Sequence, residues 1–280
     1  MKWISFKTTK GPSFGLVKDK GIIDIGASSG FASLKALLES GELEQTGQQA
    51  LNQQADISLK DIEYLPVIPN PDKILCAGVN YKAHREETGR EATAHPTIFT
   101  RFAASQMGHE QPMLRPLESE KLDYEGEIAL IIGKAGRRIP AHQALAHVAG
   151  FSAYNDGSVR DFQRHTSQFT PGKNFMQTGG FGPWMMTPDE IGDLSAMQIT
   201  TRLNGEVMQQ ATSDLLIFGF GELIEYCSTF TELVPGDVIV TGTPGGVGAA
   251  RNPPVFMTQG DVIEVEVRPI GTLRHKIAVG

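Results

Sequence analysis

Short strand-like runs separated by turns are the feature of this sequence that most restricts its fold. From residue 71 onward, seven such runs follow one another: KILCAGVN, TIFTRF, EIALIIG, HVAGFSAYN, QITTRLNG, DVIVTG and DVIEVEV. Turn-forming sequences such as VPGD, TQGD and RPIG separate several of them. Helical stretches are few, chiefly PAHQALAHV and FGELIEYCSTF. This pattern predicts an α+β, mostly β fold with a mixed, mainly antiparallel architecture instead of a doubly wound sheet.

The first 70 residues predict a smaller α+β unit. KWISFK, FGLVKD and GIIDIG indicate strands, and FASLKALLES indicates a helix that ends at Gly41. The polar segment LEQTGQQALNQQAD is a possible second short helix, and the proline-rich YLPVIPNPDK follows it. We therefore predict a small N-terminal domain over residues 1–70 and a larger domain over residues 71–280.

Charge and cysteine usage narrow the kinds of partner. The 280-residue chain has a formal net charge of -7 and no run of Lys or Arg longer than a pair, which argues against nucleic acid and anionic membranes. No segment has about 20 apolar residues or the pattern of an export signal. Cys76 and Cys227 lack the spacing of a disulfide framework or zinc site. We expect a cytoplasmic protein that binds a small molecule.

Two carboxylates interrupt a segment that is otherwise suited to burial. In LDYEGEIALIIG, residues 122–133, Glu125 and Glu127 are two positions apart, so in a strand their side chains point to the same face. A solvated strand face is one interpretation. The aliphatic residues that follow favour another, because buried carboxylates must protonate, pair with cations or bind a metal.

A third acid completes a candidate metal site. Asp156 follows the predicted strand AGFSAY at its carboxyl end, where loops commonly carry binding groups. Three oxygen ligands suit Mg²⁺, Mn²⁺ or Ca²⁺, and the lack of nearby His or Cys at ligand spacing argues against zinc. Asp161 is a competing carboxylate, but its neighbour Arg160 favours a structural ion pair.

His84 and Glu87 form a candidate acid–base pair. They are three residues apart in NYKAHREETG, so on a helix they share one face and can hydrogen-bond each other. A histidine oriented by a carboxylate can act as a general base for water. A polar surface turn is the alternative interpretation, and Glu86 replaces Glu87 as partner only if the segment is not helical. Tyr81, just before it, is a candidate substrate contact.

Two further segments offer groups that bind anions. Lys173 follows a Pro-Gly turn in TPGKNF and could point its ammonium at an oxyanion, although a lone loop lysine is usually solvated. TGTPGGVG, residues 241–248, lacks the Lys-Ser/Thr ending of a P-loop. Its backbone N–H groups and the Thr243 hydroxyl could still bind a carboxylate, or its glycines could simply adopt positive φ.

Residues 71–280 resemble the fumarylacetoacetate hydrolase family. The resemblance rests on eight matches in the family's order: CAGVNYKAH, LDYEGEIALIIGK, NDGSVRDFQ, TPGKNF, FGPW, LNGEVMQ, LVPGDVIVTGTPGGVG and QGDVIEVEVRPIGTL. It implies a mixed β-roll of the type found in the family's C-terminal domain, assembled as a homodimer.

The resemblance also implies roles for individual residues. It assigns the divalent cation to Glu125, Glu127 and Asp156, the His-x-x-Glu pair of a lid segment to His84 and Glu87, and the remaining family positions to Lys173, Gln163 and Thr243. Arg101 stands in FTRF where many members have F-x-K-P, so this position keeps a positively charged side chain, but its reach and geometry differ. Arg101, Arg160, Arg164 and His165 are the candidate partners of a distal substrate carboxylate.

The implied activity is hydrolysis of a carbon–carbon bond in an acylpyruvate or related β-diketo acid, such as fumarylpyruvate or maleylpyruvate. The products are pyruvate and a carboxylic acid, as in aromatic-compound catabolism. In this mechanism His84, oriented by Glu87, activates water while Lys173 stabilises the oxyanion. Oxo-acid decarboxylation, hydroxymuconate-type isomerisation and sugar-acid dehydration are alternatives on the same metal site, and a metal-clamped ligand-binding protein is the non-enzymatic alternative.

Overall fold

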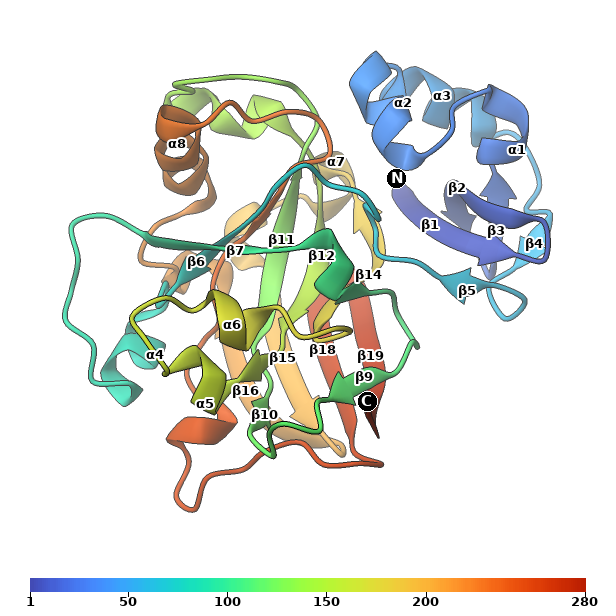
Figure 1. Cartoon of the computed structure of the whole chain (residues 1–280). Helices are drawn as coiled ribbons and strands as arrows, with labels where there is room; N and C mark the ends of the chain where they lie inside the picture. The colour runs from blue at the N-terminus through green and yellow to red at the C-terminus, as the bar shows by residue number, and fades with distance from the viewer.

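The computed structural model describes residues 1–280 and contains two main β-sheets (Figure 1). The larger sheet has 12 strands. Ten follow in the spatial order β4 (Ile57–Ser58), β3 (Gly21–Asp24), β2 (Gly11–Lys18), β1 (Lys2–Thr8), β14 (Gly179–Met186), β12 (Val148–Asp156), β11 (Gly126–Ile132), β17 (Val238–Val240), β6 (Ile74–Gly78) and β7 (Thr97–Arg101). The other two, β5 (Glu63–Tyr64) and β8 (Gln106–Met107), pair with β1 and β14.

The second sheet has five strands and packs against the first. Its order is β16 (Glu206–Thr212), β15 (Gln198–Leu203), β18 (Val262–Arg268), β19 (Gly271–Val279) and β9 (Met113–Arg115), and a separate ladder joins β10 (Leu122–Asp123) to β13 (Ser158–Val159). Only the pairs β6–β17, β8–β14 and β9–β19 are parallel. The predicted mixed, mainly antiparallel α+β fold is therefore confirmed.

The helices are short and lie outside the sheets. They are α1 (Gly26–Ser29), α2 (Leu34–Ser40), α3 (Leu43–Ala50), α4 (Lys82–Glu87), α5 (Arg160–Gln163), α6 (Thr170–Lys173), α7 (Pro188–Ile191) and α8 (Phe220–Phe230), with 3₁₀ turns at η1 (Ala103–Ser105), η2 (Ala141–His147), η3 (Leu194–Ala196), η4 (Ser213–Leu215) and η5 (Gly248–Ala250). Helix α2 ends at Gly41, which has a φ of 77°. The predicted helix in PAHQALAHV is a 3₁₀ segment. A membrane-spanning helix would have to be longer and more apolar than any of these.

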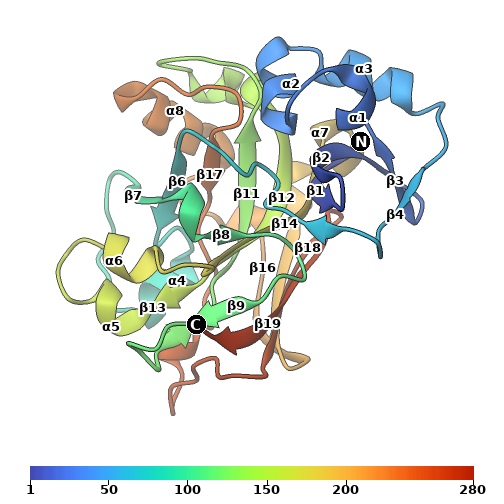
Figure 2. The same cartoon turned by 45° about the vertical axis from the view of Figure 1, so that its right-hand side comes forward.

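One sheet crosses the predicted domain boundary. Strand β1 pairs with β14, placing Trp3 opposite Met185, and Figure 2 shows the N-terminal strands beside β12 and β14. A single core cluster of 22 buried residues contains Trp3 and Phe14 as well as Tyr154 of β12. The division at residue 70 stays a prediction, and the two parts share both hydrogen bonds and core.

Three long strands were not anticipated from the sequence. Strand β14, with the sequence GGFGPWMM, joins the N-terminal strands to the rest of the large sheet. Its glycines and proline disfavour strand structure in isolation, so only pairing on both sides stabilises it. Strands β16 and β19 were missed because their polar residues mask the alternation of buried positions.

The centre of the large sheet positions the candidate site. Strand β11 is buried along its whole length, and it runs antiparallel to β12 with Gly126 opposite Asn155 and Glu127 opposite Tyr154. The start of β11 thus lies beside the end of β12. The aliphatic side chains of β11 pack in the two largest core clusters, on opposite faces of the strand. These contacts hold the acidic residues at the strand end rigidly in place.

Candidate metal centre and its cavity

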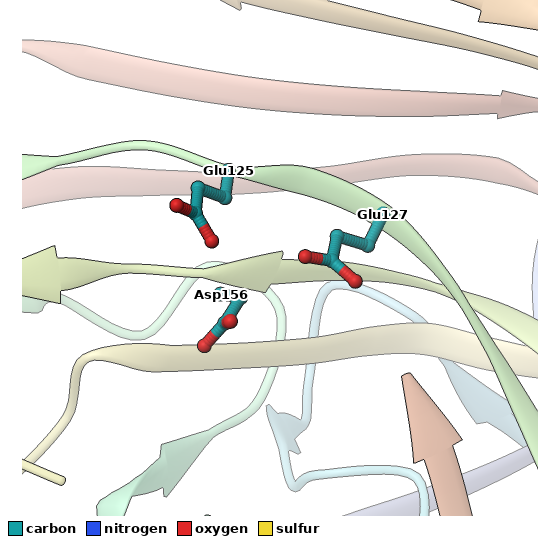
Figure 3. A group of neighbouring side chains, drawn as sticks. All are labelled: Glu125, Glu127 and Asp156. Atoms are coloured by element: carbon teal, nitrogen blue, oxygen red, sulfur yellow. The ribbon is translucent and has the colours of Figure 1, made fainter. Parts of the chain in front are cut away.

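Three buried carboxylates converge where β11 begins and β12 ends. Glu125, Glu127 and Asp156 each offer one oxygen within 4.8 Å of the other two (Figure 3). All three residues are at most 5% exposed, which rules out the solvated strand face. Glu125 immediately precedes β11, and its carbonyl accepts a hydrogen bond from the Asp156 N–H at 2.8 Å. The strand pairing itself therefore brings the acids together.

The three carboxylates differ in how their charge is compensated. Glu125 binds Lys173 Nζ at 2.6 Å and Arg160 Nη1, and Asp156 binds Lys173 Nζ at 2.6 Å and Arg101 Nη1. Glu127 has no basic partner and accepts only the Gly242 N–H. Of the three carboxylates, Glu127 is therefore the one whose negative charge no basic side chain compensates.

The pKa shifts follow the same division. Burial, with the charges of Asp156 and Glu125 added to it, raises the pKa of Glu127 well above its usual value. Burial acts on Glu125 in the same direction, but Lys173 and Arg160 outweigh it and lower the pKa of that carboxyl. The ionised form of Glu127 therefore requires a further positive charge nearby.

The donor set fits a hard divalent cation. The buried cluster comprises four carboxylates, Asp123, Glu125, Glu127 and Asp156, and three cations, Arg101, Arg160 and Lys173. One negative charge is uncompensated in this balance. Mg²⁺ and Mn²⁺ prefer carboxylate oxygens, so the buried triad could hold either ion. The added charge would leave the cluster net positive and would favour an anionic ligand.

A cavity of about 490 Å³ opens over the triad. Its acidic and basic lining residues are Glu125, Glu127, Glu87, His84, Lys173, Arg160, Arg90 and Arg164, and Gln163 and Thr243 also line it. Phe99 and Phe169 form an aromatic wall with ring centroids 5.7 Å apart. One cavity therefore holds most of the residues that the sequence singled out.

His84 and Glu87 meet on helix α4, as the helical spacing predicts. His84 Nδ1 lies 2.7 Å from Glu87 Oε1, and the other oxygen of Glu87 accepts the Gly246 N–H at 2.7 Å. A carboxylate can only accept, so the proton of the neutral ring is on Nδ1 and Nε2 carries a lone pair. The His84 side chain is only 8% exposed. A polar surface turn is thus the wrong interpretation of this segment.

Lys173 lies in the interior of the site. The residue is 1% exposed, its ammonium bridges Glu125 and Asp156, and Nζ lies 4.9 Å from the centroid of the Phe99 ring. Burial alone would lower the pKa of Lys173, but Asp156 and Glu125 raise it above its usual value. The side chain is therefore a fixed positive charge at the cavity wall.

Two predicted substrate contacts do not reach the cavity. The guanidinium of Arg101 is fully buried and binds Asp156, the Gly157 carbonyl and Thr178 Oγ1. Tyr81 is 2% exposed and packs in the core beneath α4. The interpretation of these two residues as substrate contacts is corrected accordingly, because their side chains are enclosed by protein. Arg101 instead orients a carboxylate of the triad.

Arg160 has a different partner from the one that the sequence suggested. Its Nε donates to Asp123 Oδ2 at 2.8 Å, and its Nη1 donates to Glu125 and to Gln163 Oε1. Asp161 instead accepts from the Ser119 hydroxyl at 2.8 Å. The predicted Arg160–Asp161 ion pair is therefore wrong: Asp161 belongs to another set of contacts although it is adjacent in sequence.

Asp123 was not predicted from the sequence, although a signal for it was present. Asp123, Glu125 and Glu127 form one D-x-E-x-E series in LDYEGE, so the alternation extends one step further back. Asp123 is 0% exposed. Its position at the end of the short ladder between β10 and β13 could not be inferred, because β13 comprises only Ser158 and Val159.

The glycine-rich segment 241–248 binds carboxylates of the protein itself. Gly242, Gly246 and Gly248 donate their N–H groups to Glu127, Glu87 and Asp123. Thr243 donates its hydroxyl to the Gly126 carbonyl at 2.9 Å and accepts from Gln209. Gly242 and Gly246 have φ values of 105° and 106°, so positive φ is also required here. The loop thus ties the triad, the acid–base pair and Asp123 together.

Comparisons with known proteins show what the chain is similar to. The family model "Fumarylacetoacetate (FAA) hydrolase C-terminal" matches residues 73–278. The mitochondrial oxaloacetate tautomerase FAHD2A of Bos taurus is 37% identical over 275 residues, which cover 95% of this chain and 88% of that protein. The oxaloacetate tautomerase YisK of Bacillus subtilis (strain 168) is 40% identical over 224 residues, 79% of this chain and 74% of that one.

A solved structure adds a metal and a ligand to the comparison. The maleylpyruvate hydrolase from Sphingobium sp. SYK-6, in complex with manganese(II) and pyruvate, superposes with a TM-score of 0.84 and 26% sequence identity. The alignment covers 100% of both chains. Divalent metal binding thus occurs on the fold that this chain adopts.

Proposed function

The chain belongs to the fumarylacetoacetate hydrolase family, and from this premise we propose that it catalyses the metal-dependent keto–enol tautomerisation of oxaloacetate or a closely related 2-oxo diacid. The observation that carries the proposal is the shared cavity, which is lined by Glu125 and Glu127 of the acidic triad and by a histidine oriented by a glutamate. Two relatives named as oxaloacetate tautomerases support this reaction over the carbon–carbon hydrolysis expected from the sequence.

The floor of the cavity binds the 2-oxo acid end of the substrate. Arg160 lines the cavity, is 5% exposed, and has one guanidinium nitrogen, Nη2, without a hydrogen-bond partner. An unpaired buried N–H costs about 1–3 kcal/mol, which an oxygen of a bound carboxylate would offset. Gln163 and Lys173 lie beside it. Held by Glu125, Glu127 and Asp156, Mg²⁺ or Mn²⁺ would supply Lewis-acid polarisation of the 2-oxo group.

Proton transfer falls to His84. In the enol-to-keto direction the hydroxyl on C2 loses a proton and C3 gains one, and the reverse holds for enolisation. His84 Nε2 can accept and return a proton, because Glu87 keeps Nδ1 protonated and orients the ring. The Lys173 ammonium stabilises the negative charge that develops on the C2 oxygen while the proton is being transferred.

The outer part of the cavity suits a second carboxylate. Arg90 and Arg164 are exposed, line the cavity, and form none of the ion pairs found in this structure. Arg90 lies 5.1 Å from the centroid of the Phe169 ring, which holds it at the aromatic wall. These two side chains replace Arg101 and Arg160 as candidate partners of a distal carboxylate.

The test follows the ultraviolet absorbance of enol-oxaloacetate as it disappears in the presence of protein and Mn²⁺. We expect a metal-dependent acceleration that EDTA removes and that His84→Ala abolishes while Mn²⁺ remains bound. Equal rates with and without protein contradict the proposal. Oxalate binding to the Mn²⁺-loaded protein separates an enzyme with exchangeable metal positions from a purely structural metal clamp.

Hydrolysis of an acylpyruvate is the second candidate function. The water-activating geometry of His84 and Glu87 favours it, since a histidine oriented by a carboxylate can act as a general base for water. A panel of acylpyruvates, oxaloacetate and hydroxymuconate-type acids distinguishes the reactions. Pyruvate with a stoichiometric acid indicates hydrolysis, pyruvate with CO₂ indicates decarboxylation, and a changed tautomer alone indicates the proposed activity.

We also propose that the protein is a homodimer, as the resemblance implies. Light scattering coupled to size exclusion tests this directly. A mass near the chain mass of 30.3 kDa contradicts the proposal, and twice that mass supports it.

A further inference from the structure

We propose that Asp123 is a positioning residue that acts through Arg160, holding its guanidinium in the cavity wall against which the oxo acid binds. The inference rests on the proposed function, since it concerns how the same cavity recognises a 2-oxo carboxylate. It assigns a role to an acid that is neither a metal ligand nor an acid–base group.

Asp123 has no capacity left for chemistry of its own. Its Oδ1 accepts the N–H groups of Tyr124 at 2.8 Å and Gly248 at 2.9 Å, and its Oδ2 accepts Ala249 N–H at 2.9 Å and Arg160 Nε at 2.8 Å. A carboxylate offers about four lone-pair sites, and all are used here. The side chain therefore serves to fix other groups in place.

The bond to Nε determines where the rest of the guanidinium points. Arg160 is anchored on one side by Asp123 and on another by Glu125 and Gln163 through Nη1. The guanidinium is planar, so two anchored nitrogens also determine the direction of the third. Nη2 is the nitrogen that remains, buried and without a partner in a residue that lines the cavity.

Asp123 also holds a second part of the cavity wall, formed by the segment around Ala249. Ala249, whose N–H it accepts, lines the cavity together with Val247 and Ala250. The Asp123 carboxylate thus fixes the position of both the Arg160 guanidinium and an apolar part of the wall of the same cavity. Replacing Asp123 by Asn keeps an acceptor for the Tyr124 and Gly248 N–H groups but places an NH₂ where Arg160 Nε and the Ala249 N–H both need an acceptor.

The test compares Asp123→Asn with Asp161→Asn, the matched control. Asp161 is the sequence neighbour of Arg160, but it contacts Ser119 and the Phe162 N–H and not the guanidinium. Calorimetry measures Mn²⁺ affinity and then oxalate affinity of the Mn²⁺-loaded protein. We expect Asp123→Asn to weaken oxalate binding about tenfold or more, as for loss of one charge-assisted hydrogen bond, with Mn²⁺ affinity changed less than about threefold.

A double-mutant cycle with Arg160→Lys identifies the route of the effect. If Asp123 acts through Arg160, the two changes are non-additive, and Asp123→Asn adds little to the loss caused by Arg160→Lys. Additive losses, an effect no larger than that of Asp161→Asn, or an equal loss of Mn²⁺ affinity overturn the inference while leaving the proposed function intact. If Asp123→Asn does not fold, Asp123→Glu, which displaces the same carboxylate by one methylene, takes its place with the same expected outcomes. Failure of the unmodified protein to bind oxalate overturns the proposed function and the inference with it.

Discussion

The floor of the cavity and its lid side are built in different ways. The floor consists of Glu125, Glu127 and Asp156, placed by the pairing of β11 with β12, and of Lys173 at the end of α6, and every residue in it is at most 5% exposed. The lid side consists of α4 and its following loop together with Arg164. There, Arg90 and Arg164 are exposed, and Glu87 is held by His84 and by one N–H of the glycine-rich loop, without a basic partner other than His84. A rigid, buried floor is suited to metal binding, whereas a more exposed wall is suited to discrimination between substrates.

The difference explains why the floor alone does not identify the reaction. Relatives and structural neighbours named as tautomerases and as a hydrolase share this family and fold. A divalent cation held by the acidic triad would polarise a bound oxo acid whichever of these reactions follows. The outcome then depends on what the lid side supplies, namely the position of the base, access of water and the contact with the distal group. The following predictions test this division.

His84→Ala should have the largest effect on turnover. Removal of a general acid–base group lowers kcat by about 10²–10⁴-fold. Metal binding should be unchanged, because the ring contacts Glu87 and not the triad. Steady-state kinetics and Mn²⁺ titration of the same preparation check both parts. Turnover that survives the substitution would show that proton transfer does not depend on the lid side.

Glu125→Gln and Glu127→Gln should each lower Mn²⁺ affinity by more than about 100-fold, since changes behind a metal ligand already cost about 10–100-fold. Their effects on the metal-free protein should have opposite signs. Glu127→Gln removes a buried carboxyl group whose charge has no basic partner and should raise Tm, whereas Glu125→Gln removes one carboxylate partner from both Lys173 and Arg160 and should lower it. Thermal unfolding in EDTA measures this. Two changes of the same sign would contradict the charge balance derived for the floor.

Lowering the pH should decrease the free energy of unfolding through His275, a buried residue of the second sheet. This residue is 1% exposed on β19, where its Nδ1 donates to the Gln111 carbonyl and its Nε2 has no partner. Burial lowers the pKa of His275 from 6.5 to about 4. The unfolded chain therefore takes up the proton first, and stability present above pH 6.5 is lost as the pH falls towards 4, by about 3 kcal/mol.

Chemical unfolding of the protein and of His275→Gln across this pH range checks the prediction. The substitution removes the titrating group, so the slope of stability against pH should decrease. Half-buried His109, whose pKa burial also lowers to about 4, remains in both proteins, so part of the slope should persist in His275→Gln. An unchanged slope would assign the acid sensitivity to other groups.

Arg90→Gln and Arg164→Gln should have the smallest effects. Both side chains are exposed, so solvent screens their contact with a distal carboxylate, and KM for oxaloacetate should rise only about threefold to tenfold. A 2-oxo monoacid that lacks the second carboxylate should show no change. Kinetics with both substrates measures the difference. A loss of kcat in place of higher KM would mean that the lid arginines contribute to the reaction itself.

Much of the site could be predicted because its spacing reflects local geometry. Glu125 and Glu127 share a face through strand alternation, and His84 and Glu87 meet through helical spacing. Partners distant in sequence were harder to predict. Arg160 was expected to bind its neighbour Asp161, yet it binds Asp123, 37 residues away, because helix α5 turns the guanidinium towards the start of β11.

The sequence by itself determined the mixed, mainly antiparallel β class, the shared face of Glu125 and Glu127, and the acid–base pair, since each follows from a repeating local geometry. The tertiary structure decided which cations neutralise which acids. It enclosed Arg101 behind Asp156, brought Lys173 between two carboxylates, and left Glu127 without a basic partner. Coulomb interactions in a buried site depend on distances between strands that are far apart in the chain, and only folding sets those distances.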